Sequence, residues 1–168
     1  MNTKSLLIGG LTLIAGCAAP PPPPPMDLQT HFNAEEHQRF MKHGSATIRG
    51  QGFLRQQGGG VVTCAGYPVQ LIPATPYFRE VVHQLRIGRR PGPGQSLDSY
   101  REYFKRSTCD AQGNFDFENL PAGDWFVMTE VRWTVANMPQ GGVLLREVTA
   151  EDHDVAQVLL SDSDFFGR

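Results

Sequence analysis

The stretch of sequence that decides the fold is GNFDFENLPAGDWFVMTEVRW, residues 113–133. In its first part, Phe115 and Phe117 alternate with polar residues. In its second part the odd-numbered positions are mostly apolar, namely Trp125, Val127, Val131 and Trp133. Alternation with a period of two is typical of strands that bury one face, because successive side chains point to opposite sides of a sheet. The stretch therefore predicts two strands, joined by the turn residues Pro121 and Gly123.

Five other short segments also have strand character, because they are rich in β-branched and apolar residues and are bounded by turn residues. They are 46–54, 61–64, 69–72, 143–148 and 155–160. The glycines near the middle of the first segment, Gly50 and Gly52, predict a β-bulge. Together the segments predict a mainly β fold, a sandwich of about seven strands.

Residues 113–125 carry the pattern Gly-x-Phe-x-Phe-x-x-Leu-Pro-x-Gly-x-aromatic. This pattern resembles that of the carboxypeptidase regulatory-like domains, and the resemblance extends over roughly residues 46–135. It implies a seven-stranded, prealbumin-like (transthyretin-like) β-sandwich in which Leu120 closes one end of the core. The family implies a fold and an accessory role more than an activity.

Two segments depart from the strand pattern. Residues 33–44 predict a short N-terminal helix, with Asn33 as its N-cap. Residues 45–168 are predicted to form the sandwich domain. Within it, apolar residues recur at helical spacing, which predicts a partly helical insertion at about 74–107.

The insertion is basic, whereas the chain from residue 17 onward is acidic overall. Between residues 79 and 106 there are seven basic and three acidic side chains, while the chain from residue 17 carries a formal net charge of −3. Local positive charge predicts a contact surface for an anionic envelope component or an envelope protein. A solvated loop without a partner is the alternative. The candidate binding residues are Arg86, Arg89, Arg90, Arg101, Lys105 and Arg106.

The N-terminus has the features of a targeting segment. One positive charge precedes an apolar run at residues 6–14, which is too short to span a bilayer as a helix. The sequence LIAGC at residues 13–17 resembles the lipobox of bacterial lipoproteins. The resemblance implies removal of a signal peptide, residues 1–16, and acylation of Cys17. Ala18 at the next position implies the outer membrane, with the protein facing the periplasm, and an ordinary secreted protein is the alternative.

Residues 17–32 are predicted to be a proline-rich tether between the lipid and the fold. Six consecutive prolines, residues 20–25, favour an extended polyproline II conformation. At about 3.1 Å per residue they form a stiff spacer of roughly 19 Å. The tether is expected to hold the domain away from the lipid headgroups.

Cys64 and Cys109 are the two cysteines outside the lipobox. An even pair in an oxidising compartment predicts one structural disulfide. The alternative is a reactive or metal-binding thiol, but neither cysteine has a base or further ligands close to it in the sequence.

Motifs for catalysis, metal binding or cofactor binding are lacking in the sequence. It contains no His-x-x-Glu zinc pair, no Gly-x-Ser-x-Gly elbow and no phosphate-binding glycine loop. The charge balance does not indicate nucleic-acid binding. His37 and His43 are expected to be solvated, and the acidic cluster around His153 is expected to be a solvated turn. Trp125 and Trp133 are expected in the core, with a stacking platform for sugars as the alternative.

The sequence thus predicts a membrane-anchored periplasmic lipoprotein that acts as a non-enzymatic binding or structural module of the cell envelope. The protein is expected to associate with the membrane through the lipid on Cys17, and no cofactor, metal or nucleic acid is expected to bind to it. Two alternatives stay open. The first is a subunit of a larger envelope assembly. The second is an enzyme or metal protein that uses His153 with its acidic neighbours.

Overall fold

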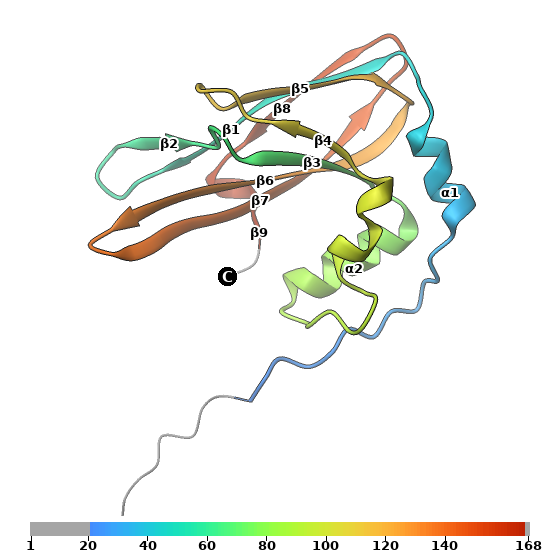
Figure 1. The fold of residues 1–168 in the computed structure, drawn as a ribbon, viewed down its shortest axis with the longest axis horizontal. Coiled ribbons are helices and arrows are strands. Elements are labelled where there is room, and N and C mark those ends of the chain that lie inside the picture. The colour runs from blue at the N-terminus through green and yellow to red at the C-terminus, as the bar shows by residue number, and fades with distance from the viewer. Residues whose placement is uncertain (1–20, 167–168) are drawn as a thin grey trace, which may run out of the picture.

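The computed structural model describes residues 21–166 and shows strands in two layers with helices beside them (Figure 1). The helices are α1 (Ala34–Gln38) and α2 (Pro76–Arg86), with the 3₁₀ helices η1 (Arg39–Met41), η2 (Leu97–Tyr103) and η3 (Asp162–Asp164). The strands are β1 (Ala46–Arg55), β2 (Val61–Thr63), β3 (Pro68–Pro73), β4 (Lys105–Thr108), β5 (Asn114–Leu120), β6 (Gly123–Val135), β7 (Met138–Ala150), β8 (Val155–Leu160) and β9 (Phe165–Phe166).

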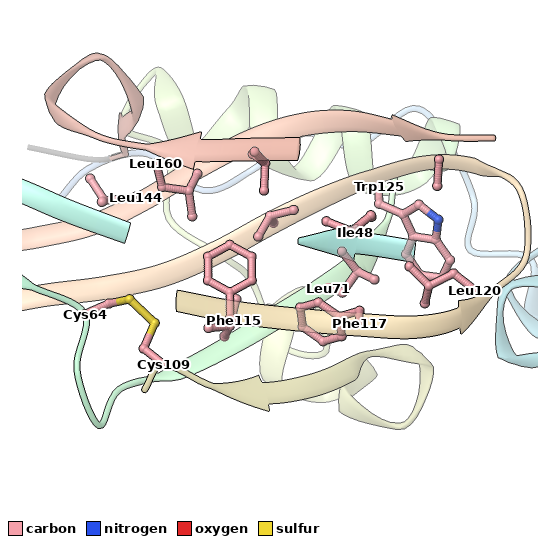
Figure 2. Packing of buried hydrophobic residues seen from close by; sticks show 14 of the residues in the cluster. Ile48, Cys64, Leu71, Cys109, Phe115, Phe117, Leu120, Trp125, Leu144 and Leu160 are labelled. Carbon is pink, nitrogen blue, oxygen red and sulfur yellow. A yellow bond between two sulfur atoms is a disulfide. The ribbon is translucent and has the colours of Figure 1, made fainter. Parts of the chain in front are cut away.

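The strands form two sheets that pack face to face. In the first sheet β1 pairs with β2 and β5 in antiparallel orientation and with β8 in parallel orientation. The second sheet has the order β4-β3-β6-β7-β9 and is antiparallel throughout. Buried side chains between the sheets form the main core, which Figure 2 shows from Trp125 at one end toward the Cys64–Cys109 disulfide. The prediction of a mainly β sandwich is confirmed.

The prediction of seven strands is wrong, because the described residues contain nine. β4 has the sequence Lys-Arg-Ser-Thr, which lacks an apolar face, and it pairs only with β3 at the edge of the sheet. β9 has two residues and pairs with the edge of β7. Neither strand gives a sequence signal, because one is polar on both faces and the other is too short to show a period.

The glycines of β1 make space for the core instead of forming a bulge, so that prediction is also wrong. The register shift in β1 lies between Ala46 and Ile48. A Cβ atom on Gly50 would come within 2.5 Å of the Phe115 ring and of Val158. Glycine is required at this position because two neighbouring side chains approach the backbone of the strand closely.

The helices cover the outer face of the second sheet. Phe126 of β6 points to this face, together with Ile72 of β3 and Leu145 of β7, and all three are buried. Phe78 and Val81 of α2 pack against them. The apolar stripe of α2 therefore buries a sheet face that would otherwise be exposed, and the helices form a third layer on the sandwich.

A buried histidine joins the N-terminal segment to this layer. His37 is fully buried rather than solvated, so the prediction for this residue is wrong. Its Nδ1 lies 2.6 Å from the carbonyl oxygen of Asn33, and its Nε2 lies 2.9 Å from the hydroxyl of Thr75. The imidazole also stacks on Phe32, with 4.2 Å between ring centroids. The spacing of His37 and His43 does not reveal which side of α1 faces the sandwich. In the structure it is the side with His37 that packs against the domain.

Burial lowers the pKa of His37 below its ordinary value of 6.5, although its hydrogen bond to Asn33 acts in the opposite direction. We therefore predict that the folded protein loses stability as the pH falls below about 6.5. Below that pH the unfolded chain binds a proton on His37, whereas the folded chain with its lowered pKa resists protonation.

The measurement is the midpoint of thermal unfolding as a function of pH, for the wild type and for His37→Gln. Glutamine keeps hydrogen-bonding groups at this position but does not titrate. The loss of stability at acidic pH should be smaller in the variant, and an equal loss in both proteins would show that His37 is not responsible.

Candidate functional site

One end of the sandwich is open. The antiparallel pairing of β6 and β7 continues to Val135 opposite Met138 at the tip of the hairpin. In Figure 1 this hairpin and the β1–β2 hairpin extend from the same end of the sandwich. Along the inner face of β6, Trp125 and Val131 are fully buried, Trp133 is half-buried and Val135 is 50% exposed. The core thus opens into a space between the two hairpins, which we call the hairpin cleft.

Each of the two hairpins ends in a tight turn. In the β1–β2 turn, the backbone N–H of Gln56 donates a hydrogen bond to the carbonyl of Gly60 at 2.8 Å. The β6–β7 turn consists of Ala136 and Asn137, which both have positive φ angles of 47° and 63°. A two-residue turn with two positive φ angles matches the twist of the flanking strands. Alanine is strained in this conformation because its Cβ approaches the following carbonyl oxygen.

Two aromatic side chains, Trp133 and Phe165, line the hairpin cleft together with four aliphatic residues, and each ring lies on a glycine of β7. The aliphatic residues are Leu54, Val135, Met138 and Pro139. A Cβ atom on Gly141 would come within 2.9 Å of the Trp133 indole. A Cβ atom on Gly142 would come within 2.7 Å of the Phe165 ring, which is 40% exposed. The Gly141–Gly142 pair therefore lets both rings rest on the strand backbone beside the cleft.

The rim of the hairpin cleft is polar and carries balanced charge. The cleft has a volume of about 900 Å³. Gln56, Gln57 and Gln140 contribute side-chain amides to its lining. Arg55 and Asp162 contribute one positive and one negative charge, and the backbone N–H of Arg55 donates to the Asp162 carboxylate at 3.3 Å. Amides both donate and accept hydrogen bonds, so the rim suits a neutral ligand that is rich in hydroxyl groups.

The six predicted basic residues lie outside the hairpin cleft, on several segments. The guanidinium of Arg86 lies 5.8 Å from the centre of the Phe166 ring. Arg101 of η2 pairs with Asp98, with 2.6 Å between nitrogen and oxygen. The others lie in the loop after α2 (Arg89 and Arg90) and on β4 (Lys105 and Arg106). Their role as a binding surface stays a prediction.

The predicted disulfide is present. Cys64 and Cys109 are bonded and buried, and they join the segment after β2 to the segment after β4. Gly52 accommodates the bond, because a Cβ atom there would come within 2.9 Å of the Cys64 sulfur. Cys17, with the predicted signal peptide and lipobox, lies outside the described residues.

The two tryptophans have different environments. Trp125 is fully buried in the core, as predicted, whereas Trp133 lines the hairpin cleft. Sequence reasoning missed Phe165 and the three glutamines of the rim. The glycines at 58–60 and 141–142 are the signal that could have pointed to two projecting hairpins with closely packed side chains.

The acidic turn near the C-terminus lies apart from the hairpin cleft. His153 is exposed, has a positive φ of 61°, and its backbone N–H donates to the Ser45 hydroxyl at 3.1 Å. From residue 21 to residue 166, no three His, Cys, Asp or Glu side chains are grouped so that they could hold a metal ion. Over the same residues, every helix is too short or too polar to cross a membrane.

The strain in the β6–β7 turn gives a prediction for stability. Replacing Ala136 with glycine should stabilise the protein by about 0.5–1 kcal/mol, because relief of the left-handed strain exceeds the extra entropy of glycine in the unfolded chain. Asn137→Gly is the matched control and should change stability less, because asparagine tolerates this conformation. Both values follow from denaturant unfolding. A destabilised Ala136→Gly protein would contradict the turn geometry.

Comparison with solved structures finds a similar fold in a Pseudomonas aeruginosa protein that has been proposed to bind carbohydrate. Its crystal structure matches with a TM-score of 0.63 and 26% sequence identity, and the match covers 79% of this chain and 98% of that one. The pilus backbone protein of Streptococcus pneumoniae matches at a TM-score of 0.32 and 9% identity over 70% of this chain and 41% of that one, which is too weak to support an argument. No family model and no curated protein matches the chain.

Proposed function

We propose that this chain is a membrane-tethered, non-enzymatic module that binds neutral carbohydrate in the hairpin cleft. The observation that carries the proposal is the pairing of an aromatic surface, Trp133 and Phe165, with a rim of glutamine amides. The cleft lies at the open end of a sandwich whose other buried side chains already form a packed core.

The chemistry of the cleft matches that of a sugar. A pyranose ring has an apolar face of C–H groups, which packs against the electron-rich face of an aromatic ring. Its hydroxyl groups donate and accept hydrogen bonds, as the amides of Gln56, Gln57 and Gln140 also do. Arg55 and Asp162 balance each other in charge, which favours a neutral ligand over an anionic one.

The comparison with the Pseudomonas aeruginosa protein supports this proposal. That protein has been proposed to bind carbohydrate, and the match covers nearly all of its chain. The lack of recognisable catalytic motifs in the sequence supports a binding role without catalysis. The resemblance to carboxypeptidase regulatory-like domains, which are accessory modules, supports the same role.

The tether is the second part of the proposal. The lipobox-like sequence at residues 13–17 supports acylation of Cys17, and Ala18 supports transfer to the outer membrane. Two or more acyl chains give stable anchoring, because each buried methylene contributes about 0.8 kcal/mol. The module then faces the periplasm, where a disulfide between Cys64 and Cys109 is stable.

The test of the binding site compares Trp133→Ala with the wild type on a panel of neutral and acidic oligosaccharides. We expect the wild type to bind neutral members of the panel. Loss of the indole face should weaken binding by about tenfold or more, equivalent to about 1.4 kcal/mol, as measured by titration calorimetry.

Leu159→Ala is the matched control, because Leu159 is also apolar and is 47% exposed but lies on β8 outside the cleft. This variant should bind like the wild type. Equal affinities of Trp133→Ala and the wild type would rule out the hairpin cleft as the site. Recovery of a chemically altered oligosaccharide would rule out the non-enzymatic role.

The test of the anchor is the mass of the protein isolated from the membrane fraction of cells that express the full chain. We expect the chain to begin at Cys17 and to carry acyl groups, and Cys17→Ser to remove both the added mass and the cleavage. An unmodified mature protein that is released as a soluble species would contradict the proposed anchor.

A further inference from the structure

The C-terminal end of α2 forms a small basic and apolar projection. We call residues 86–90 (Arg86, Ile87, Gly88, Arg89 and Arg90) the arginine tip. Gly88 has a positive φ of 75°, which ends the helix and turns the chain outward. The three arginines are exposed, and Ile87 is 55% exposed. The tip thus combines three exposed guanidinium groups with one exposed apolar side chain.

The tether leaves the folded domain at the arginine tip. The backbone N–H of Arg90 donates to the carbonyl of Pro24 at 2.8 Å, and the N–H of Met26 donates to the carbonyl of Arg90 at 2.8 Å. Met26 is buried beneath this contact, with 6% of its surface exposed. The last two prolines of the run are therefore fixed to the domain, so they do not add to the length of the predicted spacer.

The position of this contact limits the distance from the tip to the lipid anchor. Pro24 is seven positions after Cys17 along the chain. At about 3.1 Å per position in a polyproline II conformation, these seven steps would span roughly 22 Å. The arginine tip is therefore within reach of the membrane surface whenever Cys17 is inserted. In Figure 1 the tip of the β6–β7 hairpin lies apart from the point where the N-terminal segment reaches the domain.

The charge of the arginine tip is not neutralised by the domain. Within residues 21–166, none of Arg86, Arg89 and Arg90 pairs with a carboxylate, in contrast to Arg101, which pairs with Asp98. No acidic residue occurs between residues 84 and 97. Asp27 is the one acidic residue of the segment 21–32 and pairs with none of the three arginines, so the tip keeps a net positive charge.

From these observations we propose that the arginine tip binds the headgroup phosphates of anionic phospholipids in the membrane that carries the tether. The proposal rests on the anchor at Cys17 and does not depend on sugar binding in the hairpin cleft. Guanidinium groups make paired hydrogen bonds to phosphate, and Ile87 is placed to enter the interfacial region between headgroups. The domain is then held against the membrane by its tip.

The test attaches the domain to a membrane at its natural position, whether or not cells acylate it. The chain from Cys17 to Arg168 keeps every residue of both buried clusters. With Cys64 and Cys109 bonded, Cys17 is its one free thiol and can be coupled to a maleimide lipid in nanodiscs. The folded state of the coupled protein is checked by its circular dichroism. The readout is the rotational correlation time of the domain from NMR relaxation.

On discs that contain phosphatidylglycerol, we expect the domain to tumble with the disc and to show a severalfold longer correlation time than on phosphatidylcholine discs. High salt should abolish the difference, because it screens exposed charges. Each basic residue near an anionic surface strengthens binding about fivefold. Arg89→Glu should therefore release the domain, whereas Arg106→Glu, the same charge change on the exposed β4, should not.

Three results would overturn the proposal. The first is a short correlation time on both kinds of disc, and the second is a long time that Arg89→Glu leaves unchanged. The third is release by Arg106→Glu to the same extent as by Arg89→Glu, since docking would then follow net charge and not the arginine tip. Failure of Cys17 acylation in cells would instead contradict the anchor and would leave the disc result unaffected.

Discussion

The pairing of β6 with β7 is the interaction on which the other parts of the structure depend. The two strands stay in register from Gly123 opposite Ala150 to Val135 opposite Met138. Near its base the hairpin supplies Trp125 to the core between the sheets, and on its outer face Phe126 and Leu145 receive the helical layer. Near its tip the same hairpin supplies Trp133 to the hairpin cleft.

This arrangement links stability to the candidate site through one element. The buried half of β6 is held in place by the core. The exposed half continues the same strand, so its position and twist are set by the buried half. The Gly141–Gly142 pair then determines where the Trp133 and Phe165 rings can lie, because both rings rest on the backbone at these positions. A binding surface on a rigid strand loses little conformational entropy when a ligand binds.

The sequence predicts those parts of the fold that repeat a local pattern. β6 was predictable because its alternation continues through the core, and the disulfide was predictable because Cys64 and Cys109 form an even pair once Cys17 is set aside. β4 was not, since an edge strand with polar residues on both faces has no period to detect. The burial of His37 was also not predictable, because α1 has only five residues. The side of α1 that faces the domain depends on aromatic residues far away in the sequence, such as Phe78.

The candidate site was only partly predictable for the same reason. From the sequence, Trp133 could lie in the core or form a stacking surface. Which of the two holds depends on how far the opposing sheet extends over the strand. Phe165 and the rim glutamines come from three separate turns or strand ends, and only the fold brings them together. The arginine tip illustrates the converse case, since its basic residues were visible in the sequence but its contact with the tether was not.

The most direct measurement of the central claim is an NMR titration that follows the indole N–H signals of the two tryptophans during addition of a neutral oligosaccharide. Binding in the hairpin cleft should shift the signal of the half-buried Trp133 and leave that of the fully buried Trp125 in place. Saturable binding with an unmoved Trp133 signal, or with equal shifts of both signals, would contradict a sugar site at the open end of the sandwich.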